Sequence, residues 1–94
     1  MISEYQDICL ICGKPKTDIH HLVYGRGLRE LAEKDNLKIP LCRACHESIH
    51  KIGIAGVESK IIGQLTFEID KVEEGMSPKE ARELFRKRYG RSYL

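Results

Sequence analysis

Apolar residues recur at steps of three and four in the second half of the chain. In "GIAGVESKIIGQLTFEIDKVEEG" this spacing predicts one face of an amphipathic helix, which Gly63 interrupts. We expect that face to form core against the preceding segments of the chain, not a ligand pocket. Its members are Val57, Ile61, Leu65, Ile69 and Val72.

A second helix is predicted at the C-terminal end, in "MSPKEARELFRKRYGRSYL". Ser77 is a typical N-cap residue, Pro78 fits the first helical position, and Glu80 stands at the capping-box position. The same helix should end near Tyr89, because Gly90 favours the left-handed conformation that closes helices.

Shorter elements are predicted in the first half. "VYGRGLRELAEKDN" begins with two glycines and continues with Leu28, Leu31 and Ala32 at helical spacing, so a turn and a short helix are expected. An extended segment is expected at "DIHHL" and a strand before Cys42. A further helix is expected from Arg43 to about Lys51.

Length and composition limit the fold. With 94 residues the chain is below the size at which a hydrophobic core alone stabilises comfortably, so a metal or another cross-link is expected. The formal net charge of +2 permits nucleic-acid binding without requiring it. The N-terminal "MISEYQDI" lacks the features of a signal peptide, and no apolar run is long enough for a membrane span. We therefore expect a soluble, intracellular protein.

The four cysteines form two Cys-x-x-Cys pairs, Cys9 with Cys12 and Cys42 with Cys45. This spacing is typical of a closed tetrathiolate zinc site, and the glycine after Cys12 allows the chain to fold back around an ion. A redox pair or disulfides are the alternatives. The sequence around neither pair has the βαβ pattern of thioredoxin-like redox proteins, which favours structural zinc.

The histidines indicate a second metal site. On a helix, His46 and His50 share one face, whereas the neighbours Cys45 and His46 point about 100° apart. A third ligand must then come from the adjacent His20 and His21. In an extended segment these two face opposite sides, so one can bind the ion while the other faces a substrate. A single Cys2His2 finger fits poorly, because its spacing would be too long and would leave two cysteines unused.

The order of these motifs resembles the HNH endonuclease family. The resemblance rests on Cys-x-x-Cys, then "DIHHL", then "DNLKIPLCRACHESIH", across residues 9–50. More loosely, "GRGLRELAEKDNLKIPLC" and the ending "FRKRYGRSYL" resemble small HNH proteins encoded by phages and prophages. The resemblance implies a zinc-braced ββα-metal finger, and together with the two helices predicted after it the expected fold is α+β. We expect the chain to form a single domain, 1–94, with the finger at about 5–52 and the helical extension at about 56–94.

The resemblance also assigns roles to residues. It makes His21 the general base. His20, His46 and His50 become the ligands of a catalytic divalent cation, which is Mg²⁺, Mn²⁺, Ni²⁺ or Zn²⁺. The four cysteines bind a separate, structural Zn²⁺. Asn36 matches the family's central asparagine, which helps to hold the base and its loop. The alternative for Asn36 is an ordinary turn ahead of a strand.

Asp18 lies two residues before His20, where its carboxylate can contact a metal ligand from behind.

The implied function is metal-dependent hydrolysis of DNA phosphodiester bonds, by nicking or by double-strand cleavage. A neutral imidazole suits proton abstraction from water near neutral pH. The alternative is a non-catalytic, zinc-dependent nucleic-acid-binding module, against which stands His21, since a binding module has no need of a free imidazole there. The resemblance implies a cytoplasmic location in a bacterial host cell. The oligomeric state is not indicated.

Basic residues supply candidate phosphate contacts in two places. Arg26 and Arg29 should lie close to the histidine site, unless they are solvated or pair with Glu30 and Glu33. Near the C-terminus the candidates lie in a cluster with Tyr89 and Tyr93 nearby, whose alternative is a solvated helix face. Those candidates are Arg86, Lys87 and Arg88.

Overall fold

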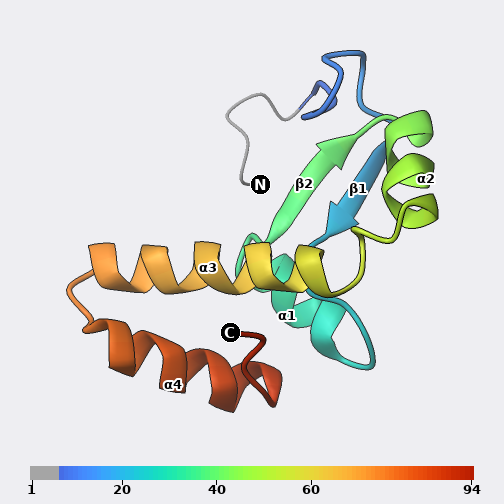
Figure 1. The fold of residues 1–94 in the computed structure, drawn as a ribbon. Helices are drawn as coiled ribbons and strands as arrows, with labels where there is room; N and C mark the ends of the chain where they lie inside the picture. The colour runs from blue at the N-terminus through green and yellow to red at the C-terminus, as the bar shows by residue number, and fades with distance from the viewer. Residues whose placement is uncertain (1–6) are drawn as a thin grey trace.

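The computed structural model describes residues 7–94 and contains a two-stranded antiparallel sheet with helices around it (Figure 1). The elements are β1 (Asp18–His21), α1 (Leu28–Lys34), β2 (Lys38–Leu41), α2 (Arg43–Lys51), α3 (Val57–Glu73) and α4 (Pro78–Tyr89). The predicted α+β class is confirmed. Along the described part of the chain, no helix combines the length and the apolar character that crossing a membrane requires.

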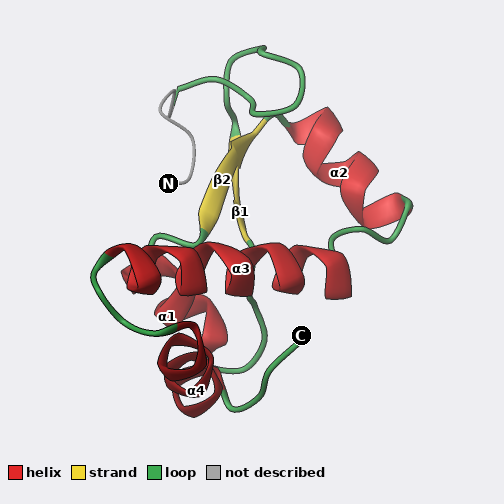
Figure 2. Ribbon diagram, turned by 60° about the vertical axis from the view of Figure 1, so that its left-hand side comes forward, coloured by secondary structure: helices red, strands yellow, loops and turns green. Residues whose placement is uncertain are grey.

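The strand register fixes which side chains face the helices. His20 stands opposite Ile39, and His21 stands opposite Lys38. Because neighbouring residues of a strand face opposite sides, His20 is buried while His21 is only half-buried. Helix α2 lies beside β1, whereas α1, α3 and α4 gather at the end of the sheet where β1 ends and β2 begins (Figures 1 and 2).

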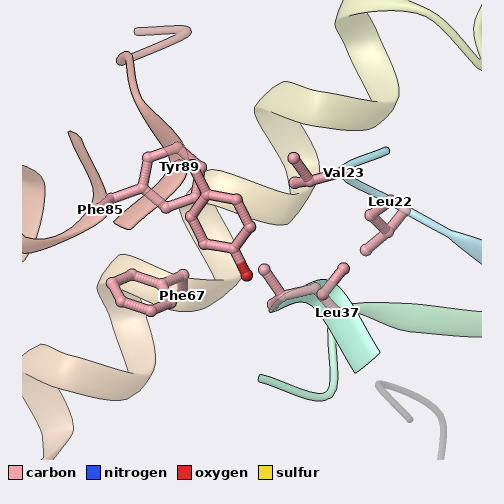
Figure 3. Close-up of a cluster of buried hydrophobic side chains, with 7 residues drawn as sticks. Leu22, Val23, Leu37, Phe67, Phe85 and Tyr89 are labelled. Carbon is pink, nitrogen blue, oxygen red and sulfur yellow. The ribbon is translucent and has the colours of Figure 1, made fainter. Parts of the chain in front are cut away.

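The main hydrophobic core joins the end of β1 to α1, α3 and α4 (Figure 3). Phe85 stacks on Tyr89 with ring centroids 4.4 Å apart, and Phe67 meets Phe85 edge-on at 5.4 Å. Aromatic pairs in these arrangements add to the stabilisation that comes from burying their area. The buried members are Leu22, Val23, Ala32, Leu37, Phe67, Phe85 and Tyr89.

Helix α4 has the bounds that its capping residues predict. The side chain of Ser77 accepts a hydrogen bond from the backbone N–H of Glu80, and Gly90 closes the helix at a φ of 86°. Asp35, just after α1, accepts hydrogen bonds from Arg88 Nε at 2.6 Å and from the Tyr89 hydroxyl at 2.5 Å. These contacts attach the C-terminal helix to the turn between α1 and β2.

The prediction of which face of α3 is buried in the core is wrong. Exposed fractions are 60% for Val57, 43% for Leu65, 56% for Ile69 and 41% for Val72, and only Ile61 of that set is half-buried. The helix instead buries a mixed face that faces β1 and α4. The buried residues are Ser59, Gly63, Gln64, Phe67 and Glu68.

Close packing at Gly63 explains the difference. A Cβ at this position would lie 2.7 Å from Val23 Cγ2 and 3.1 Å from Leu22 Cβ, so only glycine lets α3 approach the chain after β1 this closely. The helix is continuous through Gly63, which therefore marks a contact and not an interruption. The polar residues of the buried face have partners; Gln64, for example, donates to Glu68 Oε2 at 2.6 Å.

This orientation of α3 predicts opposite outcomes for two neighbouring substitutions. Phe67→Ala should lower the free energy of unfolding by about 3–5 kcal/mol, because it empties a core position. Leu65→Ala should stay within about 0.5 kcal/mol of the wild type, because its side chain faces solvent. Urea unfolding followed by circular dichroism measures both, and equal losses would contradict the orientation described.

Candidate metal centres

The four cysteine thiols converge at one end of the sheet. Cys9 and Cys12 lie in the loop before β1, where Gly13 adopts a φ of 77° directly after the second thiol. Cys42 and Cys45 lie at the junction of β2 and α2. Cys42 is also the N-cap of α2, and its Sγ accepts a hydrogen bond from the Cys45 backbone N–H at 3.5 Å.

The spacing of the sulfur atoms fits one tetrahedral ion. All four Sγ atoms lie within 4.8 Å of one another, and Cys12 Sγ is 3.7 Å from Cys42 Sγ. Zinc–sulfur bonds of about 2.3 Å at tetrahedral angles separate two sulfurs by roughly 3.8 Å. All four are free thiols and not disulfides. The cluster is therefore compatible with a structural metal such as zinc.

The thiols differ in how readily they lose a proton. Burial raises the pKa of Cys9, but hydrogen bonds from the backbone of Cys12, Cys42 and Ile11 outweigh it and bring the pKa to about 6. A hydrogen bond with Cys42 raises the pKa of Cys45 to about 12. Protons and a metal ion compete for these sulfurs, so a lower pH should weaken metal binding by the four thiols.

Three histidines form a second, separate cluster. His20 comes from β1, and His46 and His50 come from one face of α2; one ring nitrogen of each lies within 4.8 Å of the others. His46 Nε2 is 3.3 Å from His50 Nε2. Two nitrogens bound to one ion at about 2.0–2.1 Å lie roughly 3.4 Å apart at tetrahedral angles, so this pair fits a shared cation.

Asp18 lies behind the histidine cluster, as the sequence predicted for a contact with a ligand. Its Oδ2 is 2.9 Å from His46 Nδ1, which leaves Nε2 of that ring to face the cluster. The hydrogen bond with His46, followed by the charge of Arg43, holds the pKa of Asp18 below its ordinary value. The carboxylate therefore stays ionised and fixes the orientation of the ring.

Ser59 of α3 orients His20 in the same manner and was not predicted from the sequence. Its hydroxyl donates to the Leu22 carbonyl at 2.8 Å, so its oxygen accepts from His20 Nε2, 2.9 Å away. The lone pair of His20 is thereby left on Nδ1. Burial, followed by the charges of His46, His50 and His21, lowers the pKa of His20 to about 4, which keeps the ring in the neutral, ligating form.

His21 is held outside the three-histidine cluster. Its Nε2 lies 2.7 Å from Glu33 Oε2 of α1, and Glu33 Oε1 accepts from Lys38 Nζ at 2.5 Å. These contacts, first the hydrogen bond with Lys38 and then the one with His21, lower the pKa of Glu33 to about 2. Glu33 therefore pairs with His21 and Lys38 instead of the arginines considered from the sequence.

A pocket of about 200 Å³ opens over the histidines. Arg29 lies at this pocket, as the sequence predicted, whereas Arg26 is exposed in the turn before α1 and does not line it. The lining residues are Ile19, His20, His21, Tyr24, Arg29, His46 and His50.

Asn36 lies in the turn between α1 and β2, not among the residues that line this pocket. It has a φ of 63°, a left-handed conformation that asparagine tolerates better than most residues. Its backbone N–H donates to the Glu33 carbonyl at 3.3 Å. The left-handed backbone at this position therefore favours asparagine over most other residues.

The predicted phosphate contacts on α4 differ in availability. Arg86 and Lys87 are exposed, and Arg86 makes only a surface ion pair with Glu83. Arg88 is instead half-buried, and its hydrogen bond to Asp35 raises its pKa. The bond to Asp35 makes Arg88 a weaker candidate for contacting phosphate than Arg86 or Lys87.

Comparison with known proteins places the chain in a family. The profile of a family described as "Protein of unknown function (DUF968)" matches residues 5–76, and the chain belongs to this family. The match includes both metal clusters and all of α3, and it ends before α4. No curated protein and no solved structure matches the chain.

Replacing a cysteine should abolish both metal binding and folding. Cys9→Ser and Cys42→Ser each remove one of four candidate ligands, and we expect folding of so small a chain to be coupled to metal binding. We expect zinc content to fall and the cooperative unfolding transition to be lost, as measured by atomic absorption and circular dichroism. A zinc-free Cys9→Ser protein that still unfolds cooperatively would contradict a structural metal.

Ser59→Ala should weaken the binding of a divalent cation at the histidine cluster by about 10–100-fold, the usual cost of losing a contact behind a ligand. Titration calorimetry of the zinc-loaded protein with Mn²⁺ measures this affinity, since Mn²⁺ prefers nitrogen and oxygen ligands to thiolates. Ser48→Ala is the matched control, because the Ser48 hydroxyl donates to the Ala44 carbonyl of its own helix. Equal affinities in the two variants would exclude the role given to Ser59.

Proposed function

We propose that this protein is a metal-dependent endonuclease of the HNH type, which hydrolyses DNA phosphodiester bonds with His21 as general base. One observation carries the proposal. His20, His46 and His50 converge on a single point, and a fourth histidine, His21, lines the same pocket. The order of elements supports it as well, because β1, β2 and α2 come in the order of the two strands and the helix of a ββα finger, with the short helix α1 inserted between the strands.

The ligand set suits a catalytic cation. Three imidazoles leave coordination positions open, in contrast to the closed set of four thiols. Mg²⁺, Mn²⁺, Ni²⁺ or Zn²⁺ held there would stabilise negative charge on the phosphate and on the departing oxygen. His20, His46 and His50 would hold this ion, while Cys9, Cys12, Cys42 and Cys45 would hold structural Zn²⁺.

His21 has the position that a proton acceptor needs. It is adjacent to the ligand His20 in the strand, yet its ring is directed to Glu33 and is not part of the cluster. A neutral imidazole beside the bound phosphate can take the proton of the attacking water. Nothing in the ligand set requires a fourth histidine, so proton transfer gives His21 a role that metal binding does not.

Exposed arginines give the proposed enzyme contacts to the DNA backbone. Arg29 at the pocket is placed to bind the phosphate that is cleaved, and Arg26 lies in the turn just before α1. Arg86 and Lys87 belong to α4, which lies beyond the lower end of the sheet, whereas α2 runs along its side, in both ribbon views (Figures 1 and 2). We propose that they contact the DNA backbone away from the cleaved bond.

Cleavage of supercoiled plasmid tests the proposal. Zinc-loaded wild-type protein with Mn²⁺ or Mg²⁺ should convert the plasmid to open-circle or linear DNA, and EDTA should prevent this. His21→Ala should lower the rate by about 10²–10⁴-fold, the contribution typical of a general base, without changing zinc content or fold. His46→Ala should abolish cleavage by removing a ligand.

Two results would contradict the proposal. Full activity of His21→Ala would remove this residue as the base. Absence of cleavage by the folded wild-type protein with every ion would instead favour a zinc-dependent nucleic-acid-binding module, and the salt dependence of its DNA affinity would then be measured.

A further inference from the structure

Glu33 is the acidic residue closest to the proposed base, and nothing in the sequence motifs assigns it a role. It lies near the end of α1, and its carboxylate joins two residues of the sheet. Oε2 lies 2.7 Å from His21 Nε2, and Oε1 lies 2.5 Å from Lys38 Nζ. His21 and Lys38 face each other across the two strands, so Glu33 closes a triangle of three side chains.

We infer that Glu33 is a positioning residue, which fixes the ring orientation and the tautomer of His21 so that Nδ1 is the atom that accepts the proton of water. This inference rests on the proposed nuclease function for its catalytic meaning. The hydrogen bond itself can be tested without any cleavage.

The tautomer follows from hydrogen-bond chemistry. An ionised carboxylate has only acceptor atoms, so the hydrogen in the bond between Glu33 and His21 must belong to Nε2. A neutral imidazole carries one hydrogen, and the other nitrogen then has the free lone pair. With Nε2 held by Glu33, the basic atom of His21 is Nδ1.

Lys38 keeps the Glu33 carboxylate ionised and in position to accept the hydrogen bond from His21 Nε2. Its ammonium binds the oxygen of Glu33 that His21 does not use, and this contact contributes most to the low pKa of Glu33, about 2. Glu33 is therefore ionised at every pH at which an imidazole base is neutral. Two bonds, one to each oxygen, also restrict rotation of the carboxylate more than either bond alone.

Exposure separates this role from a merely structural one. The side chain of Glu33 is 53% exposed, and ion pairs at such positions contribute little to folding stability. The three-histidine cluster contains similar contacts, since Asp18 holds one ring nitrogen of His46 and Ser59 holds one ring nitrogen of His20. Loss of Glu33 should therefore change His21 and leave the fold and the structural metal as they are.

The test compares three variants with the zinc-loaded, ¹⁵N-labelled wild type. Glu33→Ala removes the acceptor, and Glu33→Gln keeps the shape but can also donate. Glu30→Gln is the matched control, because Glu30 is an exposed acidic residue one turn earlier on the same helix. Long-range ¹H–¹⁵N correlation spectra at about pH 8, well above the pKa of an ordinary imidazole, report which nitrogen of His21 carries the hydrogen.

We expect the Nε2–H tautomer of His21 in the wild type and in Glu30→Gln, and a mixture of tautomers in Glu33→Ala. In plasmid cleavage, kcat should fall by about 10–100-fold in Glu33→Ala, the range seen when a contact that orients a functional group is lost. KM for DNA and the zinc content should stay unchanged. Glu33→Gln should retain more activity than Glu33→Ala, since its carbonyl can still accept from Nε2.

An Nδ1–H tautomer in the wild type would overturn the inference, and so would a Glu33→Ala variant with an unchanged tautomer. These readouts do not depend on turnover. A wild-type protein with the expected tautomer but without cleavage would therefore refute the nuclease proposal while it confirms that Glu33 orients His21. A Glu33→Ala variant with an altered tautomer and full kcat would overturn the catalytic part of the role.

Discussion

The fold depends on the convergence of four sulfur atoms between two loops that are far apart in the sequence. Cys42 connects this cluster to α2, since it is one of the four thiols and is also the N-cap residue of the helix. Any ion bound by the thiols would therefore fix where this helix begins. His46 follows one turn later and His50 one turn after that, so the start of the helix determines that both rings face β1. The structural cluster thus sets the geometry of the second one.

The histidine cluster depends equally on residues that are not themselves among the three histidines. Asp18 orients His46 and Ser59 orients His20, while Glu33 holds the neighbouring His21. Each contact engages one nitrogen of a ring, so the other nitrogen is left for a ligand or a proton. The site is organised by the carboxylates and the hydroxyl as much as by the imidazoles.

The two Cys-x-x-Cys pairs predicted the cysteine cluster, and helical spacing predicted that His46 and His50 share a face, whereas the choice of His20 over His21 came from the resemblance to HNH endonucleases. The sequence also predicted Asp18, which is two residues from His20 on the same strand. Ser59 lies 39 positions from its partner, and a serine or a glutamate on a helix is too common to signal such a contact. The buried face of α3 was missed for another reason. Apolar periodicity counts side chains, whereas this helix packs through Gly63, where the missing side chain creates the contact.

The hydroxyl of Ser59 makes α3 part of the histidine site, although the helix contributes none of its ligating atoms. A shortened chain that ended after α2 would retain every cysteine and histidine, yet it would lack the group that selects the nitrogen His20 presents. The segment that contains the whole histidine site is therefore longer than the finger that its motifs delimit. The family match, which ends beyond α3 and before α4, includes the whole of that segment.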